Sequence, residues 1–152
     1  MLLAAYGSGL YNALFLGHMV AFVVAFAPAV VHPLLSAQTK VDRDDGAFRR
    51  LLAHQAANGR RIYVPALLAL GGFGIAMVVV SDPVWAFDQT WVSLAVAVWL
   101  AICAVISGGL LPAERKAAAG DEGAEVLVER AGQVTTVLAL AMLYLMIWKP
   151  GF

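Results

Sequence analysis

The chain has 152 residues, of which 62% are hydrophobic and only 13% are charged. Soluble domains usually carry ~25% charged residues, so this composition excludes an ordinary soluble domain. Ten basic and ten acidic residues give a formal net charge of zero, which argues against nucleic acid or another anionic polymer as a partner.

Four apolar runs are long enough to cross a bilayer as helices: residues 9–35, 62–81, 89–111 and 134–148. The last run is short, and we expect its helix to begin near Asp121, which can cap the start. The segment before the first run has no basic residue, so we expect a retained helix there rather than a cleaved signal peptide. Four spans use most of the chain, which predicts one domain over residues 1–152. The expected fold is all-α, a polytopic four-helix bundle whose partner is the lipid bilayer.

Basic residues predict how the bundle is oriented. Nine of them fall in the first and third connections, whereas the second connection and the N-terminal segment have none. Positive residues stay on the cytoplasmic side, so both termini are expected outside, with Lys149 as the single exception. This orientation brings Trp85, Trp91 and Trp148 to the outer interface, where indole rings favour the headgroup region. The nine are Lys40, Arg43, Arg49, Arg50, Arg60, Arg61, Arg115, Lys116 and Arg130.

A short amphipathic helix is expected in the first connection, over residues 44–58. Apolar side chains recur there at helical spacing, namely Phe48, Leu51, Leu52 and Ala56. Asp44 or Asp45 can cap its start, and Gly59 can end it. We expect this helix to lie on the inner membrane surface, either as a structural hairpin or as a partner-binding element.

Small residues predict which helices pack closely, because they let helices approach each other in lipid. They recur at four-residue spacing in the second span (Ala66, Ala69, Gly72, Ala76) and in the third (Ser93, Ala97, Ala101, Val105). We therefore expect these two spans to form an antiparallel hairpin. The third helix is expected to run past Pro112 and to stop at Gly120, with a tight turn into Asp121.

His18 lies in the middle of the first apolar run. An ionisable side chain at membrane depth is costly and points first to a functional site. The alternative is a neutral imidazole that hydrogen-bonds a neighbouring helix. Its neighbours at helical spacing are small, aromatic or amide residues, so we expect His18 to face the bundle interior. The expected bonding partner is Asn12, Ser93, Tyr144, a water molecule or a cofactor.

Four stretches resemble a bacterial membrane family described only as a domain of unknown function: YNALFLGHMVAFVVAFAP, RRIYVPALLALGGFGI, TWVSLAVAVWLAICAVISGGLLPAERK and MIWKPG. That family is distantly similar to the membrane domain of CopD-type copper-resistance proteins and to the four-helix, haem-linked protoporphyrinogen oxidase of the HemJ type. The resemblance implies a multi-pass protein of the bacterial inner membrane and a functional role for the first-helix histidine, here His18. The lysine-bearing third helix of the oxidase is not matched, since this one has no lysine before Lys116. We therefore expect no strong protoporphyrinogen-oxidising activity.

A cofactor at His18 needs further ligands at a similar depth. A b-type haem held by two histidines is excluded within one monomer, because His32 lies ~21 Å further along the same helix and the other spans contain no histidine. Met77 and Met142 fall near the depth of His18, and a His/Met set suits haem or copper(I). Methionines in membrane helices also fill gaps, which leaves a purely structural His18 as the alternative.

Two classes of function follow. The first is a non-catalytic accessory or assembly subunit of a larger membrane complex or homo-oligomer, since the sequence has no nucleophile–base pair, paired carboxylates or phosphate-binding loop. The alternative is a haem- or copper-binding redox protein that uses His18. A transporter is disfavoured, because coupled transport normally needs several intramembrane acids or bases. Arg60 and Arg61, where the second span begins, are expected to anchor it to lipid phosphates.

Overall fold

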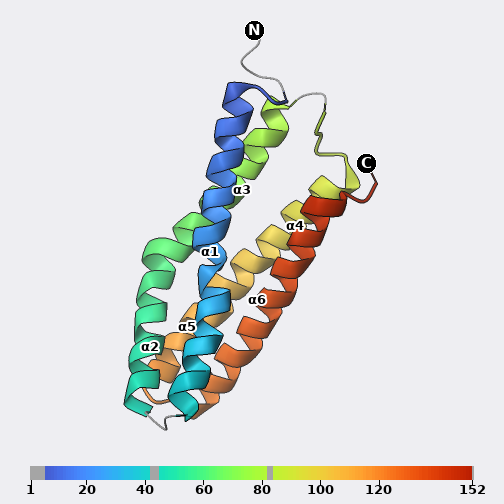
Figure 1. Cartoon of the computed structure of the whole chain (residues 1–152). Coiled ribbons are helices and arrows are strands. Elements are labelled where there is room, and N and C mark those ends of the chain that lie inside the picture. Colours follow the sequence, from blue (N-terminus) through green and yellow to red (C-terminus); the bar gives the residue numbers. More distant parts are fainter. Residues whose placement is uncertain (1–5, 42–44, 82–83, 152) are drawn as a thin grey trace.

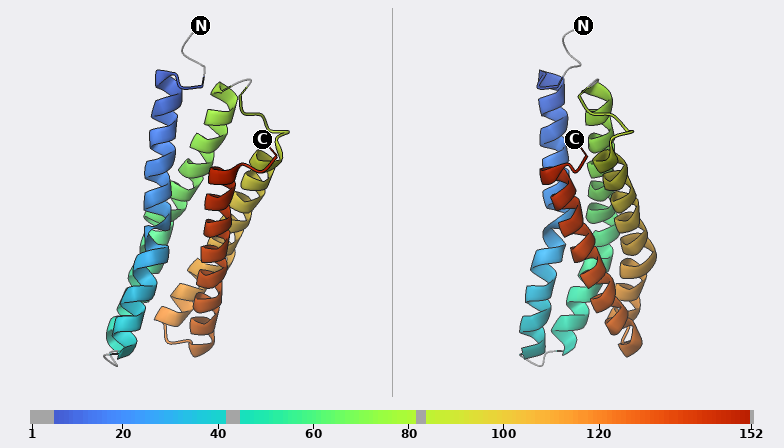
Figure 2. Two further views of the ribbon diagram at one scale, coloured as in Figure 1. Left: turned by 45° about the vertical axis from the view of Figure 1, so that its right-hand side comes forward. Right: turned by 90° about the vertical axis from the view of Figure 1, so that its right-hand side faces the viewer.

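A computed structural model describes residues 6–41, 45–81 and 84–151, and these residues form an all-helical bundle. Their helical elements, in chain order, are α1 (Gly9–Val41), α2 (Asp45–Asn58), η1 (Gly59–Tyr63), α3 (Val64–Val80), α4 (Thr90–Ala104), η2 (Val105–Leu110), α5 (Leu111–Ala118) and α6 (Glu122–Trp148). Adjoining elements run on from one another, so the described residues form four long helical rods, whose arrangement Figures 1 and 2 show. The start of α1, the end of α6 and the α3–α4 connection lie at one end of the bundle, the terminal end. The opposite end is the far end.

Two of the rods continue through a π-helical segment. α2 runs through η1 into α3, and α4 runs through η2 into α5. A proline follows each π-helical segment by two residues, Pro65 after η1 and Pro112 after η2. Because proline has no N–H, the carbonyl one turn earlier loses its usual donor, and a π-helical segment lets the neighbouring donors pair around that gap. The prediction that Gly59 ends a separate helix is therefore wrong, since Gly59 opens η1 and the chain continues.

α2 lies where the sequence predicts a short helix, but it extends α3 along the bundle (Figure 1). Its inner face packs on α5 and α6, where Leu52 forms a buried cluster with Ala117 and Ala124. His54 is exposed on its other face, whereas the Arg49 guanidinium lies beside Gly120 at the turn between α5 and α6. The predicted cap Asp44 lies outside the described residues, as does the side chain of Asp45. The pattern of apolar residues in this segment thus builds a helical extension of the bundle.

The turn between the third and fourth rods forms as predicted. α5 runs to Ala118, and Gly120 adopts a φ of 97° in the turn that follows. Asp121 then caps α6, because its carboxylate accepts a hydrogen bond from the Ala124 backbone N–H at 3.1 Å. The predicted stop at Gly120 and the predicted start near Asp121 are both confirmed.

The rods pack as two pairs at the terminal end. α1 lies along α3 and α4 lies along α6, whereas α3 and α4 share few contacts. Figure 1 shows the pairs spread apart at that end, and α2 packs against α5 towards the far end. The predicted hairpin of the second and third spans therefore forms mainly between α2 and α5, and the close packing predicted for the small residues of α3 and α4 is wrong. Gly71 and Gly74 of α3 instead make room for the rings of Trp99 and His18.

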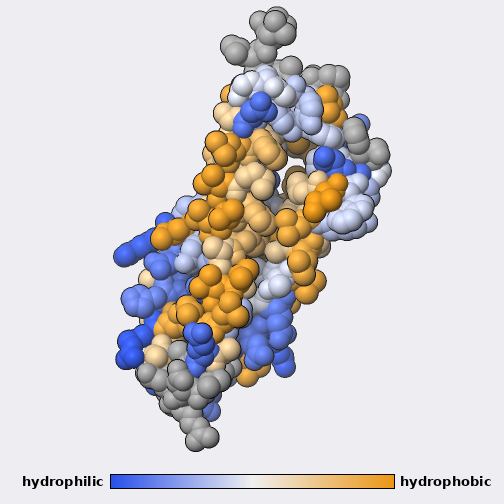
Figure 3. Space-filling model, in the orientation of Figure 1, coloured by the Kyte–Doolittle hydropathy of each residue, from blue (hydrophilic) through white to orange (hydrophobic). Residues whose placement is uncertain are grey.

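The outer surface of the bundle is apolar over much of its length. Four helical stretches are long and apolar enough to cross a membrane: Gly9–Leu35, Gly46–Val80, Thr90–Ala118 and Glu122–Trp148. Large apolar side chains such as Leu16, Val30 and Val137 are exposed on them. Figure 3 shows hydrophobic side chains across the middle of the visible face and hydrophilic ones gathered towards the far end. This surface suits lipid, and the architecture is that of a multi-pass membrane protein.

Candidate functional site

A cavity of about 690 Å³ lies between the two helix pairs at the terminal end. Figure 3 shows the molecule hollowed in this half of its visible face. Sites for small molecules and cofactors usually measure ~300–1,000 Å³ and are mostly apolar with a few polar groups, and this cavity matches that description. The lining includes Tyr11, His18, Met77, Trp85, Met142 and Lys149.

His18 reaches this cavity from α1, as the sequence predicts for a residue that faces the bundle interior. Its Nδ1 lies 2.9 Å from the backbone oxygen of Leu70 on α3. A carbonyl oxygen only accepts hydrogen bonds, so Nδ1 carries the hydrogen and donates it. In the neutral ring Nε2 then keeps its lone pair, and nothing among the described residues hydrogen-bonds it. The imidazole therefore has one nitrogen fixed by the protein and one left to accept a proton, a hydrogen bond or a metal.

Gly74 makes this arrangement possible. A Cβ at position 74 would stand 3.3 Å from Cε1 and 3.5 Å from Nδ1 of His18. The glycine lies four residues after Leu70, and its missing side chain leaves space for the ring above that carbonyl. An i+4 glycine thus opens a mid-helix carbonyl to a donor from another helix.

The same device recurs one turn earlier on α3. Trp99 of α4 donates its Nε1 hydrogen to the Leu67 carbonyl at 2.9 Å, and its ring fills the space where Gly71 lacks a Cβ. Gly71 again lies four residues after the accepting carbonyl. The two glycines therefore seat rings from the helices on either side, which fixes the walls of the cavity.

Met77 and Met142, predicted from depth alone, both line the cavity with His18. Met142 is buried and Met77 is half-buried. The thioethers of Met19 and Met146 line it as well. The structure thus brings the three residues predicted to bind a cofactor to one space, at which their sulfur and nitrogen atoms are the softest ligands.

The side-chain partners predicted for His18 bond elsewhere. Asn12 donates to the backbone oxygen of Gly7 at 3.3 Å, and Ser93 donates to the backbone oxygen of Phe87 at 2.8 Å. Tyr144 is 52% exposed and stacks on Trp148. The prediction of a side-chain partner is wrong because the glycine at position 74 exposes a backbone acceptor.

Arg60 and Arg61 do not line the cavity. They lie in η1, nearer the far end, and both are exposed. Nearby, the rings of His32 and Tyr63 meet edge to face with centroids 6.1 Å apart. An exposed arginine beside an apolar span is well placed to reach lipid phosphate, and this anchoring role stays a prediction.

An aromatic cluster lines the cavity at the terminal end, and sequence reasoning missed it. The Trp85 cluster consists of Tyr6, Tyr11, Trp85 and Trp91. Trp85 and Trp91 meet edge to face at 5.2 Å, and Trp85 Nε1 donates to the Tyr11 hydroxyl at 3.2 Å. These two indoles are only 8% and 7% exposed, so they pack within the protein, and their predicted place at the outer interface stays a prediction. Trp148 is 65% exposed, as a membrane-interface residue should be.

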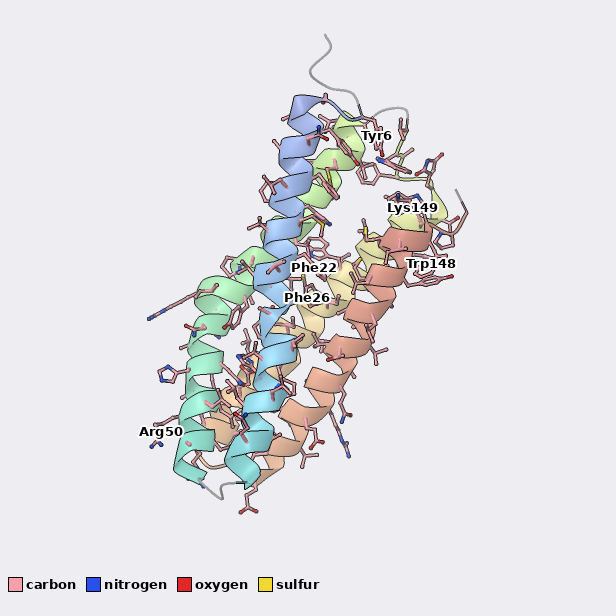
Figure 4. All side chains as sticks on the ribbon, viewed as in Figure 1. Tyr6, Phe22, Phe26, Arg50, Trp148 and Lys149 are labelled. Carbon is pink, nitrogen blue, oxygen red and sulfur yellow. The ribbon has the colours of Figure 1, made fainter. Side chains whose placement is uncertain are left out.

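Lys149 joins this cluster from the end of α6 (Figure 4). Its Nζ lies 4.8 Å from the Trp85 ring centroid and 5.9 Å from that of Trp91. Cation–π contacts of this kind are worth roughly 0.5–2 kcal/mol. Its backbone is left-handed, with φ 43° and ψ 60°, which side-chain-bearing residues rarely adopt. The signal for Lys149 was its position as the one basic residue on the side where the charge rule expects none.

A second polar feature lies outside the cavity, at the far end. Gln55 of α2 and Glu114 of α5 are 5% and 4% exposed. Gln55 Nε2 and Glu114 Oε2 have no hydrogen-bond partner among the described residues. In residues 6–41, 45–81 and 84–151, no three His, Cys, Asp or Glu side chains group as a metal site.

Comparisons with protein-family models, with curated proteins and with solved structures each find no match to this chain. What the molecule does has to be inferred from the chemistry of the cavity itself.

Proposed function

We propose that the chain binds an organic redox cofactor in the cavity beside His18, and that b-type haem is the group that fits best. The observation that carries this proposal is the bond from His18 Nδ1 to the Leu70 carbonyl, 2.9 Å long. Ligating histidines commonly donate their other ring N–H to a backbone carbonyl, which fixes the tautomer and makes the ligating nitrogen more basic.

The size of the cavity favours an organic group over a single copper ion. A copper ion needs only a few ligand atoms drawn close around it, whereas this space measures about 690 Å³. Apolar and aromatic walls suit a flat, hydrophobic macrocycle. Met77 or Met142 would supply a thioether ligand beside the His18 nitrogen.

Haem supplies one-electron chemistry when it is bound. The roles left to this chain are those of its own side chains. His18, held by Leu70, would orient the group, and the apolar lining would contact its faces. The relation to the CopD and HemJ types stays a proposal, and so does the expectation that the chain does not oxidise protoporphyrinogen.

We infer that the terminal end faces out of the cytoplasm and that the membrane is the bacterial inner membrane. The basic residues support this orientation. Nine of the ten lie in the first and third connections, and only Lys149 lies at the terminal end. Because positive residues stay on the cytoplasmic side, the far end is expected inside. The Trp85 cluster holds Lys149, which accounts for a lone cation on the outer side. In this orientation α2 and α5 form the cytoplasmic end, and Arg60 and Arg61 meet the inner leaflet.

Absorbance and metal analysis of the purified protein test the cofactor. We expect a Soret band in detergent, or its appearance when haem is added to the colourless protein, at about one haem per chain. Stoichiometric copper without a Soret band would show that the site holds an ion. A protein that stays colourless, metal-free and unable to take up haem would overturn the proposal and favour the accessory-subunit alternative.

A further inference from the structure

Lys149 forms no ion pair among residues 6–41, 45–81 and 84–151. In the described part of the chain, the only acid at the terminal end is Asp88, which is exposed, and no ion pair joins it to Lys149. The other described acidic side chains, from Glu114 to Glu129, lie on α5, in the turn before α6 or on the first half of α6, at the far end. The ammonium instead lies 4.8 Å from the centroid of the Trp85 ring. A ring face binds a cation more weakly than a desolvated carboxylate or phosphate does, so an anion that enters the cavity can take the ammonium from the ring.

A second donor stands beside it. The Tyr11 hydroxyl accepts the Trp85 Nε1 hydrogen at 3.2 Å, and its own hydrogen has no acceptor among the described residues. Tyr11 and Lys149 both line the cavity and both contact Trp85. Two donors of this kind, one charged and one neutral, are what an acidic group with two or three oxygens binds.

The spacing along α1 relates this pair of donors to His18. Tyr11 precedes His18 by seven residues, which is ~10 Å along a helix. Between them the cavity is lined by apolar side chains, among them Phe15 and Met77. A molecule that touches both ends therefore has an apolar body beside His18 and an acidic group about ten ångströms away.

We propose that the cavity takes an amphiphile with an acidic end, a carboxylate or a phosphate, and that Lys149 and Tyr11 bind that end. The proposal rests on the cavity being a ligand site, as inferred above, but not on the ligand being haem. The backbone of Lys149 supports it, since α6 ends in a left-handed residue that places a lysine at the cavity rather than in open solvent.

The test uses cofactor-free protein in phosphatidylcholine nanodiscs, with dodecanoate, dodecyl phosphate and dodecanol as probes. Tryptophan fluorescence reports binding, because Trp85 and Trp91 contact the ammonium that the anion would displace. We expect an acidic probe to bind at least about tenfold more tightly than dodecanol, as a charge-assisted hydrogen bond implies. Preference for the phosphate would point to a lipid headgroup, and preference for the carboxylate to a carboxylate-bearing ligand.

Three variants locate the effect. K149Q should bind the acid and the alcohol equally, K149R should keep the preference for the acid, and K116Q should behave as the unchanged protein. Lys116 is the matched control, an exposed lysine on α5 at the far end. Equal binding of acid and alcohol by the unchanged protein, or a preference that survives K149Q, would overturn the proposal.

Haemin and its dimethyl ester separate this inference from the proposed function. If haemin binds and the unchanged protein does not prefer acids, the haem proposal stands and the role of Lys149 is wrong. If the protein prefers acids but takes up neither haemin nor the ester, the acid site stands and the haem proposal is wrong.

Discussion

His18 depends on a residue that has no side chain. The imidazole lies so close to Gly74 that a Cβ there would stand only 3.3 Å from Cε1, and it bonds the carbonyl of Leu70 beside that glycine. A single hydrogen bond of this type contributes roughly 1 kcal/mol, so the pair sets the direction of the ring more than the stability of the bundle. Because the Leu70 carbonyl holds Nδ1, the chemistry available in the cavity is that of the unprotonated Nε2.

Replacing Gly74 with alanine should displace the ring. The new methyl would stand 3.3 Å from Cε1, so the imidazole has to move by a few tenths of an ångström and its bond to Leu70 weakens. We expect haem affinity to fall roughly five- to tenfold, the worth of about one hydrogen bond. Haem titration followed at the Soret band measures this.

Gly72 provides the control, because a Cβ there meets nothing within 4 Å. The Gly72→Ala protein should bind haem as the unchanged protein does. If both alanine variants lose affinity to the same degree, the loss belongs to α3 in general, and Gly74 has no special relation to His18.

At the level of the helices, the two rods that carry π-helical segments cross where Gly59 meets Leu111. Gly59 is buried, and a Cβ at that position would collide with the Leu111 side chain. This close contact joins the start of η1 to the start of α5, next to the interface of α2 with α5. The bundle is therefore held together at the end away from the cavity.

Gly59→Ala should loosen that crossing. Overpacking a tight contact costs about 1–3 kcal/mol, so the thermal midpoint in detergent should fall by several degrees. Gly109→Ala is the matched change in η2, where a Cβ meets nothing within 4 Å, and it should leave the midpoint nearly unchanged. Leu111→Ala should cost less stability in the Gly59→Ala background than alone, which would identify the collision as the cause. No loss in Gly59→Ala alone would show that the crossing is not tight.

Helix positions could be predicted because they depend on local patterns. Asp121 caps α6 and Gly120 forms the turn before it, and these residue types are preferred at such positions. The partners of each helix could not be predicted the same way. Small residues in α3 indicated close helix packing. Gly71 and Gly74 instead accommodate the rings of Trp99 and His18. A stripe of small residues is the same in the sequence whether a helix backbone or a ring packs against it.

The site was predicted in part for the same reason. Depth along a helix places His18, Met77 and Met142 at one level, and the structure brings all three to one cavity. Depth cannot say that the bundle opens there, nor that a backbone carbonyl will be the histidine's partner. The contact of Lys149 with the Trp85 cluster was missed. It depends on the α3–α4 connection and on the turn after α6, and neither segment has a periodic sequence pattern.

For the whole molecule, the orientation in the membrane decides which compartment the cavity faces. Single cysteines in a Cys103→Ser background can report it, at His54→Cys in α2 and at Asp88→Cys in the α3–α4 connection. Both positions are exposed. An impermeant maleimide added to intact cells should label position 88 and not position 54, because the basic residues hold α2 inside. Labelling of position 54 alone would show that the bundle has the opposite orientation and that the cavity faces the cytoplasm.

The two histidines of α1 permit the most direct test of the central claim, that His18 is the ligand in the cavity. Both are half-buried on the same helix, but only His18 lines the cavity, whereas His32 packs beside Tyr63. Haem titration of His18→Ala and His32→Ala, each checked for folding by circular dichroism, compares them under equal conditions. The account predicts that His18→Ala remains helical and loses haem affinity by more than about 100-fold, while His32→Ala binds as the unchanged protein does. A folded His18→Ala protein that keeps the Soret position and the affinity of the unchanged protein would contradict it.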